Sequence, residues 1–154
     1  MHGTRFENLA HANEAAERFA LRERVMCYIT RGGRELLVFD HVPDGGSGVQ
    51  VPGGGLEVGE SAAEGARREA FEETGLSSFG LPVYLGSHGW TSLVQMRHYF
   101  WLPLLQITPD TWDHLAEGQY VFRHRFAPLG SPGLHWDMGE ALPDLISLLS
   151  KETA

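Results

Sequence analysis

The segment that decides the fold is GGGLEVGESAAEGARREAFEETGL, residues 53 to 76. Three glycines lead into a stretch where six of the seventeen residues from 57 to 73 are glutamate, in a chain whose net charge is already -8. Like charges at neighbouring helix positions repel each other and destabilise a helix. So many carboxylates in one short segment therefore require a partner that offsets their repulsion.

Local signals predict a helix from Ala62 to Thr74. Ser61 and Glu64 match the S-x-x-E capping box, in which both side chains accept hydrogen bonds from the first backbone N–H groups. Gly75 stands where a glycine that ends a helix belongs, since glycine adopts the left-handed conformation without steric cost. The glycines before Ser61 are expected to form a tight loop that enters the helix.

Three of the glutamates, Glu69, Glu72 and Glu73, share one face of this helix. At roughly 100° per residue they fall within an arc of about 100°, at the i, i+3 and i+4 spacing that brings side chains together. Gly65, one turn earlier on the same face, is expected to leave room beside the carboxylates.

A solvated charged face is the ordinary explanation of a glutamate-rich helix. Here the carboxylates are clustered instead of alternating with cations, and only Arg67 and Arg68 oppose them. Arg68 has Glu64 and Glu72 at i−4 and i+4, so it can pair with either. Oxygen-only ligands on one rigid face suit Mg²⁺ or Mn²⁺, the hard cations that bind phosphate oxygens. The cluster is therefore interpreted as a metal site.

The glycine loop also has the spacing of a P-loop, from Gly54 to Gly59. A P-loop needs a lysine at the next position to contact phosphate oxygens, and Glu60 inverts that charge. The dinucleotide pattern G-x-G-x-x-G also fails, because Val58 stands in place of its third glycine. Neither phosphate-binding loop is present.

Outside this segment, apolar alternation predicts a mixed sheet with one helix inserted midway and one at the end. The expected strands are residues 23–31, 34–41, 49–52, 81–90, 94–104 and 118–129, and the expected final helix is about 139 to 150.

The N-terminal residues form an extension before the main domain. Residues 4 to 18 are expected to be helical, starting at a capping box of Thr4 and Glu7. The fold class is therefore mixed α/β (α+β), with residues 1–21 as the extension and residues 22–150 as one domain.

Composition limits the partners of the chain. A length of 154 residues with 42% hydrophobic content suits one domain with a real core. Net charge -8 argues against long nucleic acid or an anionic membrane as the main partner, but a divalent metal can join carboxylates to a phosphorylated small molecule. Cys27, the single cysteine, is expected to be a small buried hydrophobe. No run approaches eighteen apolar residues, so a soluble, cytoplasmic protein is expected, as a monomer or homodimer.

The loop and helix together resemble the Nudix box, G-x5-E-x7-R-E-U-x-E-E-x-G-U, where U is aliphatic. Every fixed position is met, and Ala70 is small where a bulkier aliphatic residue is common. The matching residues are Gly54, Glu60, Arg68, Glu69, Glu72, Glu73 and Gly75, followed by aliphatic Leu76. The order of strands, loop and helix extends the resemblance to most of residues 22 to 150.

The resemblance implies the Nudix fold, an α/β/α sandwich around a mixed β-sheet. It also implies hydrolysis of a pyrophosphate bond in a nucleoside diphosphate linked to a moiety X, with Mg²⁺ or Mn²⁺ as cofactor. By matched position it implies metal ligands at Glu69, Glu72, Glu73 and the backbone carbonyl of Gly53. Arg68 would orient the glutamates, and Glu60 would support the ligands without binding the metal itself.

Many Nudix proteins also use a carboxylate from a later loop as ligand or general base. The candidate here is Glu117, with Asp110 and Asp113 close by, and an ordinary loop charge is the alternative. The proton acceptor is Glu69, Glu117 or neither.

The substrate is less defined. Arg97, Tyr120 and Trp136 are candidates for substrate contact, with core packing or a surface ion pair as the alternative for each. Nucleoside triphosphates, nucleotide sugars, dinucleoside polyphosphates and capped or triphosphorylated RNA stay open. A nucleotide-binding module that does not cleave its ligand is the alternative function, and the complete box favours the enzyme.

Overall fold

The structure is a computed structural model that describes residues 3–43, 48–116 and 120–152. Its helices are α1 (Leu9–Arg18), α2 (Ala62–Thr74) and α3 (Leu142–Glu152). Its strands are β1 (Thr4–Phe6), β2 (Arg22–Arg31), β3 (Glu35–Val42), β4 (Gly53–Gly55), β5 (Val83–Trp90), β6 (Gln95–Pro103), β7 (Thr111–Ala116) and β8 (Tyr120–Pro128).

The strands form one mixed sheet in the order β1-β5-β6-β2-β3-β8-β7, with β4 added to β2. The pair β2–β6 is parallel, and the other pairs are antiparallel. The mixed sheet predicted from the sequence is confirmed.

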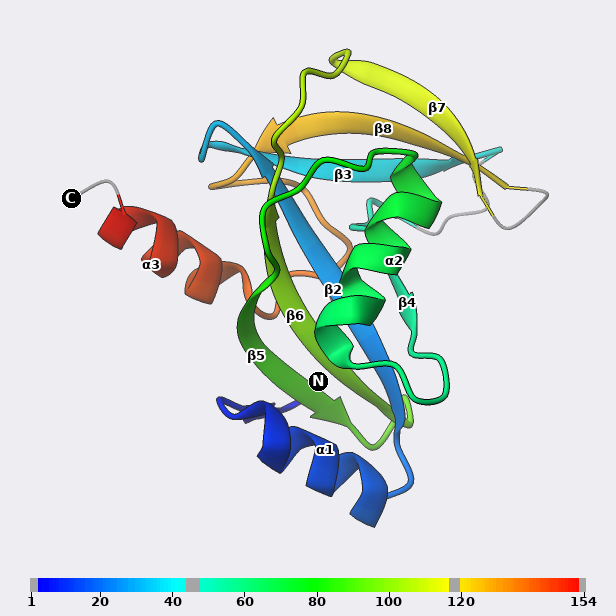
Figure 1. The fold of residues 1–154 in the computed structure, drawn as a ribbon, viewed down its shortest axis with the longest axis vertical. Coiled ribbons are helices and arrows are strands. Elements are labelled where there is room, and N and C mark those ends of the chain that lie inside the picture. Colours follow the sequence, from blue (N-terminus) through cyan, green and yellow to red (C-terminus); the bar gives the residue numbers. More distant parts are fainter. Residues whose placement is uncertain (1–2, 44–47, 117–119, 153–154) are drawn as a thin grey trace.

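The sheet divides between β2 and β3. These strands pair only at Thr30 with Leu36 and Arg31 with Glu35. Farther along, β4 pairs with β2, and Gln50 bridges to Phe39 of β3. Figure 1 shows β3, β8 and β7 turned away from β2, β6 and β5, with α2 lying across the front between the two sets. The segment before α2 therefore lies between the two sets of strands and contacts both.

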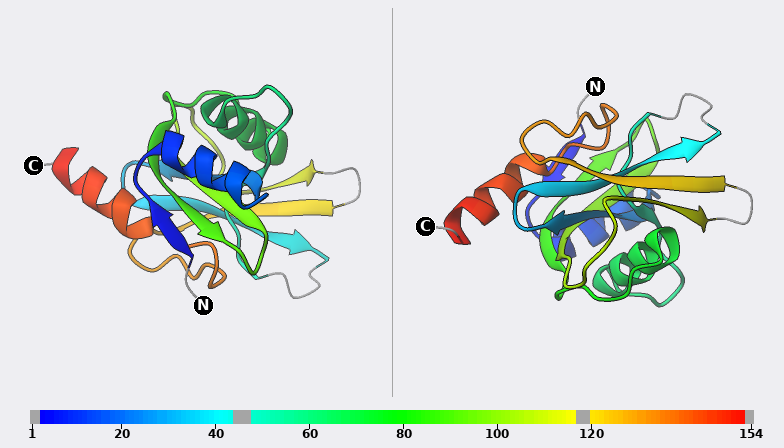
Figure 2. Two further views of the ribbon diagram at one scale, coloured as in Figure 1. Left: turned by 90° about the horizontal axis from the view of Figure 1, so that it is seen from below. Right: turned by 90° about the horizontal axis from the view of Figure 1, so that it is seen from above.

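Side chains of β2 alternate between two apolar cores, as expected for a strand buried on both faces. Val25, Cys27 and Ile29 pack with Ala66 and Ala70 of α2. On the other face, α3 covers a second core (Figure 2), which contains Met26, Tyr28, Val38, Leu145 and Leu149. Small residues let α2 approach the sheet closely, which brings its carboxylates next to β4.

The N-terminal extension is helical only in part. Thr4–Phe6 pairs with β5 as an edge strand, so the predicted capping box of Thr4 and Glu7 is wrong. The helix begins at Leu9, and the side chain of Asn8 accepts a hydrogen bond from His11 N at 3.1 Å. Because Thr4–Phe6 is extended and paired with β5, these residues cannot form the first turn of a helix.

Other boundaries differ because tertiary pairing decides them. The predicted strand at 49–52 contributes only a bridge, and the strand that pairs with β2 is the glycine run Gly53–Gly55. A Cβ at Gly53 would lie 2.5 Å from Val25 O, so only glycine fits this close approach. The final helix begins at Leu142, and β7 was not predicted.

Within the described ranges, no helix is both long and apolar enough to cross a membrane.

A buried polar chain joins the sheet to the loop after β4. His98 contacts Ser87 Oγ through Nδ1 at 2.6 Å and Glu23 Oε1 through Nε2 at 2.9 Å. Tyr84 lies 2.6 Å from the same serine oxygen, and the backbone oxygen of Glu23 accepts a hydrogen bond from Leu56 N. Burial lowers the pKa of His98, and the bond to Glu23 opposes this effect in part.

This lowered pKa predicts a loss of stability in acid. The unfolded chain takes up the proton at a pKa of about 6.5, whereas the folded chain takes it up only at lower pH. The free energy of unfolding should therefore fall as pH decreases below about 6.5. Urea unfolding at about pH 7.5 and about pH 5.5 should show a larger loss for the wild type than for His98→Gln, which cannot titrate. Equal losses would contradict the assignment.

Candidate active site on the glycine loop and helix α2

One guanidinium holds three carboxylates of the site. Arg68 donates from Nε and Nη2 to Glu60 at 2.7 and 2.8 Å, and from Nη2 to Gly55 O at 2.9 Å. Its Nη1 donates to Glu69 Oε1 at 2.8 Å and to Glu72 Oε2 at 3.2 Å. These bonds lower the pKa of Glu60 and raise that of Arg68. Arg68 is therefore the partner that offsets the repulsion among the glutamates.

The first turn of α2 has the capping box that the sequence predicts. Ser61 and Glu64 form the capping box, with bonds of 3.0 and 3.1 Å. Glu64 forms this cap, and Arg68 pairs with Glu72, the other of its two predicted partners. Gly65 makes room for the loop, because a Cβ there would overlap Leu56 Cδ2 and lie 3.0 Å from Glu60 Oε1.

Glu73 is the most deeply buried glutamate of the cluster, with 6% of the residue exposed. Its Oε1 accepts a hydrogen bond from Gly53 N at 2.6 Å. The bond ties the last turn of α2 to β4. A charged acceptor makes this a strong hydrogen bond.

Glu69 lies against the backbone of the loop. Its side chain is 12% exposed, and burial raises its pKa, although the hydrogen bond from Arg68 acts in the opposite direction. A Cβ on Gly54 would lie 2.5 Å from both carboxylate oxygens of Glu69. The box glycine is therefore required because the backbone and this carboxylate occupy adjoining space.

The carboxylates are neighbours but do not converge. Glu69 and Glu72 bind the same guanidinium, as their spacing predicts, whereas Glu73 points to Gly53. In the part of the chain that the structure describes, no three His, Cys, Asp or Glu residues are grouped so that they could hold a metal ion. The metal-ligand roles of these glutamates and of the Gly53 carbonyl stay predictions.

A cavity of about 120 Å³ opens beside Glu73 where β2 and β3 diverge. Met138 reaches it from the segment before α3, and Tyr28 Oη fixes that segment by donating to Met138 O at 2.8 Å. The other lining residues are Arg24, Met26, Phe39, His41, Gln50, Val51, Gly53 and Phe122. The sequence did not predict this wall, since its residues share no motif and come from separate segments.

Arg24 is the most informative of the missed residues. Burial lowers its pKa, and the neighbouring charges of Arg97 and Arg22 act in the same direction. The carboxylates of Glu69 and Glu73 partly oppose this effect, but among the described residues none accepts a hydrogen bond from the Arg24 guanidinium. The available signal in the sequence was an arginine directly before the apolar run of β2 that begins at Val25.

The residues predicted to contact substrate lie outside this cavity. Arg97 is buried and donates to Asp137 Oδ2 at 3.1 Å. Tyr120 is 42% exposed and stacks on His41 with ring centroids 5.7 Å apart. Trp136 is 61% exposed. A contact of any of them with substrate stays a prediction.

The predicted later carboxylate, Glu117, lies outside the described residues. The two aspartates considered beside it have cationic partners. Asp113 accepts from Arg123 at 2.9 Å, and Asp110 accepts from Arg31 at 3.1 Å.

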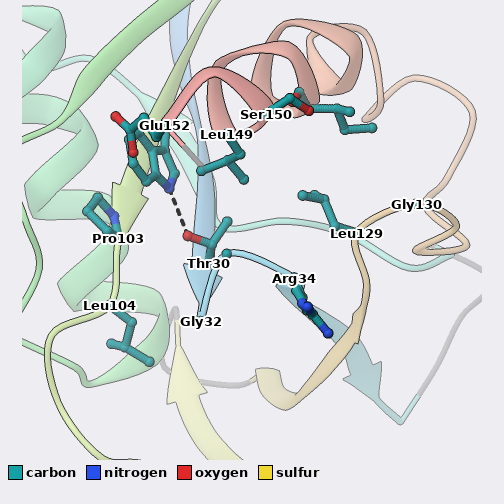
Figure 3. A pocket seen from close by; sticks show the side chains of 13 residues that line it. Thr30, Gly32, Arg34, Pro103, Leu104, Leu129, Gly130, Leu149, Ser150 and Glu152 are labelled. Carbon is teal, nitrogen blue, oxygen red and sulfur yellow. Dashed lines mark hydrogen bonds between the residues drawn. The ribbon is translucent and has the colours of Figure 1, made fainter. Parts of the chain in front are cut away.

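A larger hollow of about 750 Å³ lies at the other end of β2 (Figure 3). Thr30, Trp101, Leu129 and Leu149 line it, and Trp101 Nε1 donates to Thr30 Oγ1 at 2.7 Å. No residue of the glycine loop or α2 lines this hollow. The volume of a hollow therefore does not by itself identify the candidate active site.

Comparison with known proteins agrees with the fold and the box. A model of the NUDIX domain matches residues 20–128. A MutT structure from work on Aliivibrio salmonicida and Vibrio cholerae is similar, with TM-score 0.60 and 15% identity over 82% of this chain and 96% of that chain. A NUDIX hydrolase from Nitrosomonas europaea has TM-score 0.58 and 22% identity over 85% and 90%. A NUDIX family hydrolase from Clostridium perfringens has TM-score 0.59 and 14% identity over 85% and 97%.

The chain therefore belongs to the NUDIX family and is a Nudix-type pyrophosphohydrolase. The predicted Nudix fold is confirmed.

The contact between Gly54 and Glu69 predicts a selective effect of an added methyl group. Gly54→Ala should lower kcat/KM about tenfold or more, which corresponds to about 1.4 kcal/mol, because Cβ would displace the Glu69 carboxylate. Gly55→Ala is the matched control, since its Cβ would meet only Arg22 Nη2, at 3.9 Å. Pyrophosphohydrolase assays on both folded variants provide the measurement. Equal activities of the two variants would show that this contact is unimportant.

Proposed function

We propose that the chain hydrolyses the pyrophosphate bond of a nucleoside diphosphate linked to a moiety X, in a reaction that depends on Mg²⁺ or Mn²⁺. The observation that carries the proposal is the position of Arg24. The Arg24 guanidinium donates no hydrogen bond to a described residue. It lines the same small cavity as Glu73 and Gly53.

The charges around the cavity favour a phosphate that is accompanied by a divalent cation. A phosphate alone would be attracted by Arg24 but repelled by the carboxylates of Glu69 and Glu73. A divalent cation beside the carboxylates would reverse that repulsion. This arrangement explains how an acidic protein can bind a polyanion.

The donor set fits such a cation. Glu69, Glu72 and Glu73 supply carboxylate oxygens only, which Mg²⁺ and Mn²⁺ prefer. Within the described residues Glu69 Oε2 accepts no hydrogen bond, so its lone pairs are not used by a protein donor. When bound, the metal would polarise the phosphate and lower the pKa of the attacking water.

The protein groups around the metal have separate tasks. Arg68 and Glu60 hold the loop and the glutamates in place. Arg24 would bind a phosphate oxygen of the substrate. Glu69 is the candidate within the described residues for accepting the proton of the attacking water, because its carboxylate lies against the loop backbone and its Oε2 is not used by a hydrogen bond from a described residue.

The cavity limits what part of the substrate it can hold. Its volume of about 120 Å³ is below the roughly 300–1,000 Å³ of most ligand pockets. Because Arg24, Gly53 and Glu73 line it, the phosphate-bearing part belongs there, and the remainder of the substrate would lie outside. His41 and Met138 at its wall are then placed to contact the adjoining sugar or base.

Substitution of Glu73 tests the reaction and the metal together. Glu73→Gln should lower kcat about 100-fold or more, since removing one ligand charge costs several kcal/mol. The assay should use nucleoside triphosphates, nucleotide sugars, dinucleoside polyphosphates and triphosphorylated RNA with Mg²⁺ and with Mn²⁺, and should identify the products. Full activity of the variant would overturn the metal assignment. Thermal stabilisation by a nucleotide without turnover would indicate a binding module instead.

Substitution of Arg24 tests the phosphate contact. Arg24→Gln should raise KM roughly tenfold or more, because it removes a charge-assisted hydrogen bond. Arg22→Gln is the control, since Arg22 lies on the same strand face but is exposed and does not line the cavity. Steady-state kinetics at saturating metal measure both variants, and similar KM values would exclude the proposed contact.

A further inference from the structure

The last turn of α2 is held by ring N–H groups from outside the helix. The final four carbonyl oxygens of an α-helix have no N–H partner within the helix. In α2 they belong to Phe71, Glu72, Glu73 and Thr74. Phe71 O accepts a hydrogen bond from Gly75 N at 2.8 Å. Aromatic side chains of β7 and β8 satisfy the other three.

The three donors bind successive carbonyl oxygens. They are His114 Nε2 to Glu72 O at 2.9 Å, His124 Nε2 to Glu73 O at 2.8 Å, and Trp112 Nε1 to Thr74 O at 3.0 Å. A carbonyl oxygen can only accept a hydrogen bond, so each imidazole must carry a proton on Nε2. We call these three residues the ring clamp.

The strands and the helix cap fix the ring clamp in place. Trp112 and His124 are cross-strand partners in β7 and β8, and their rings stack with centroids 5.0 Å apart at an interplanar angle of 26°. Gly75 has φ 77°, and a Cβ there would lie 2.9 Å from His114 Nδ1. Gly75 therefore ends the helix and also leaves room for the His114 ring of the clamp.

His124 shows that the ring clamp does more than fill space. The residue is fully buried, and within the described residues its Nδ1 has no hydrogen-bond partner. Burial lowers its pKa to about 4, so the ring is neutral at physiological pH. An apolar side chain would avoid the cost of the unsatisfied nitrogen. What the histidine adds is its hydrogen bond to the backbone of Glu73.

The ring clamp holds the backbone carbonyls of two glutamates whose carboxylates are held by other groups, Gly53 N and Arg68. The Glu73 carboxylate is fixed by Gly53 N, and its carbonyl is fixed by His124. The Glu72 carboxylate is fixed by Arg68, and its carbonyl is fixed by His114. Rotation of this turn would move both carboxylates away from β4.

The geometry points to Trp112, His114 and His124 as positioning residues that aim the carboxylates of Glu72 and Glu73 at the metal of the reaction. This inference rests on the proposed function. Groups that orient metal ligands typically change metal affinity or activity by about 10–100-fold when they are removed. The expected defect is therefore in metal affinity and kcat, and substrate KM at saturating metal should change less than about twofold.

The test compares donor loss with donor replacement. His124→Leu and His114→Ala remove an N–H, and His124→Gln restores one from an amide. His88→Leu is a control for loss of a buried histidine elsewhere in the sheet, on β5. Leu115→Ala is a control for His114→Ala, because Leu115 is 61% exposed and its side chain points to the other face of the same strand. Thermal melts establish folding, calorimetric Mn²⁺ titration without substrate gives metal affinity, and kinetics give kcat and KM.

The expected result is Mn²⁺ affinity weakened about fivefold or more and kcat lowered about tenfold in His124→Leu and His114→Ala. His124→Gln and both controls should stay within about twofold of the wild type. If His124→Leu does not fold, the Mn²⁺ affinity and kcat of His114→Ala decide the test, since His114 is partly exposed. Unchanged Mn²⁺ affinity and kcat in folded clamp variants would overturn this inference but leave the proposed function in place. A wild type that neither binds Mn²⁺ nor cleaves any nucleotide would instead overturn the proposed function, and with it the inference.

Discussion

The arrangement around α2 depends on one guanidinium that opposes several carboxylates. Without Arg68, the charges of Glu60, Glu69 and Glu72 would repel one another across a short loop and a single helical turn. Its bond to Gly55 O also fixes β4 relative to the helix. Arg68 binds one oxygen of Glu69 and one of Glu72, so a cation that binds either carboxylate competes with Arg68 for the same negative charge. The same interaction that allows the cluster to fold therefore limits how tightly the cluster can hold a metal.

The helix was predictable because its signals are local. Ser61, Glu64 and Gly75 mark its ends within one segment, and the spacing of the glutamates gives their shared face. The partners of those side chains depend on the fold. The pairing of Gly53 with Met26 and the direction of Arg24 follow from distant strands that meet, and no periodicity within either segment indicates them. The same reason explains why β1 was read as helix and β7 was not predicted.

The site uses the division of the sheet between β2 and β3. One half of the sheet, through β4, holds the carboxylate of Glu73, and the other half, through β8, holds its carbonyl. The helix thereby connects two sets of strands that pair with each other directly at only two positions. The opening between them provides the cavity, so a single topological feature supplies both the space and its charged wall.

The origin of the cavity wall has a consequence for how the protein can change over evolutionary time. His41, Gln50 and Met138 come from three separate segments, and none of them belongs to the glycine loop or α2. Under the proposed function, substitutions among them would alter which molecule is accepted while the glutamates keep their geometry. The reactive apparatus and the selective surface can then accumulate mutations independently, so a change of preference need not pass through an inactive ancestor.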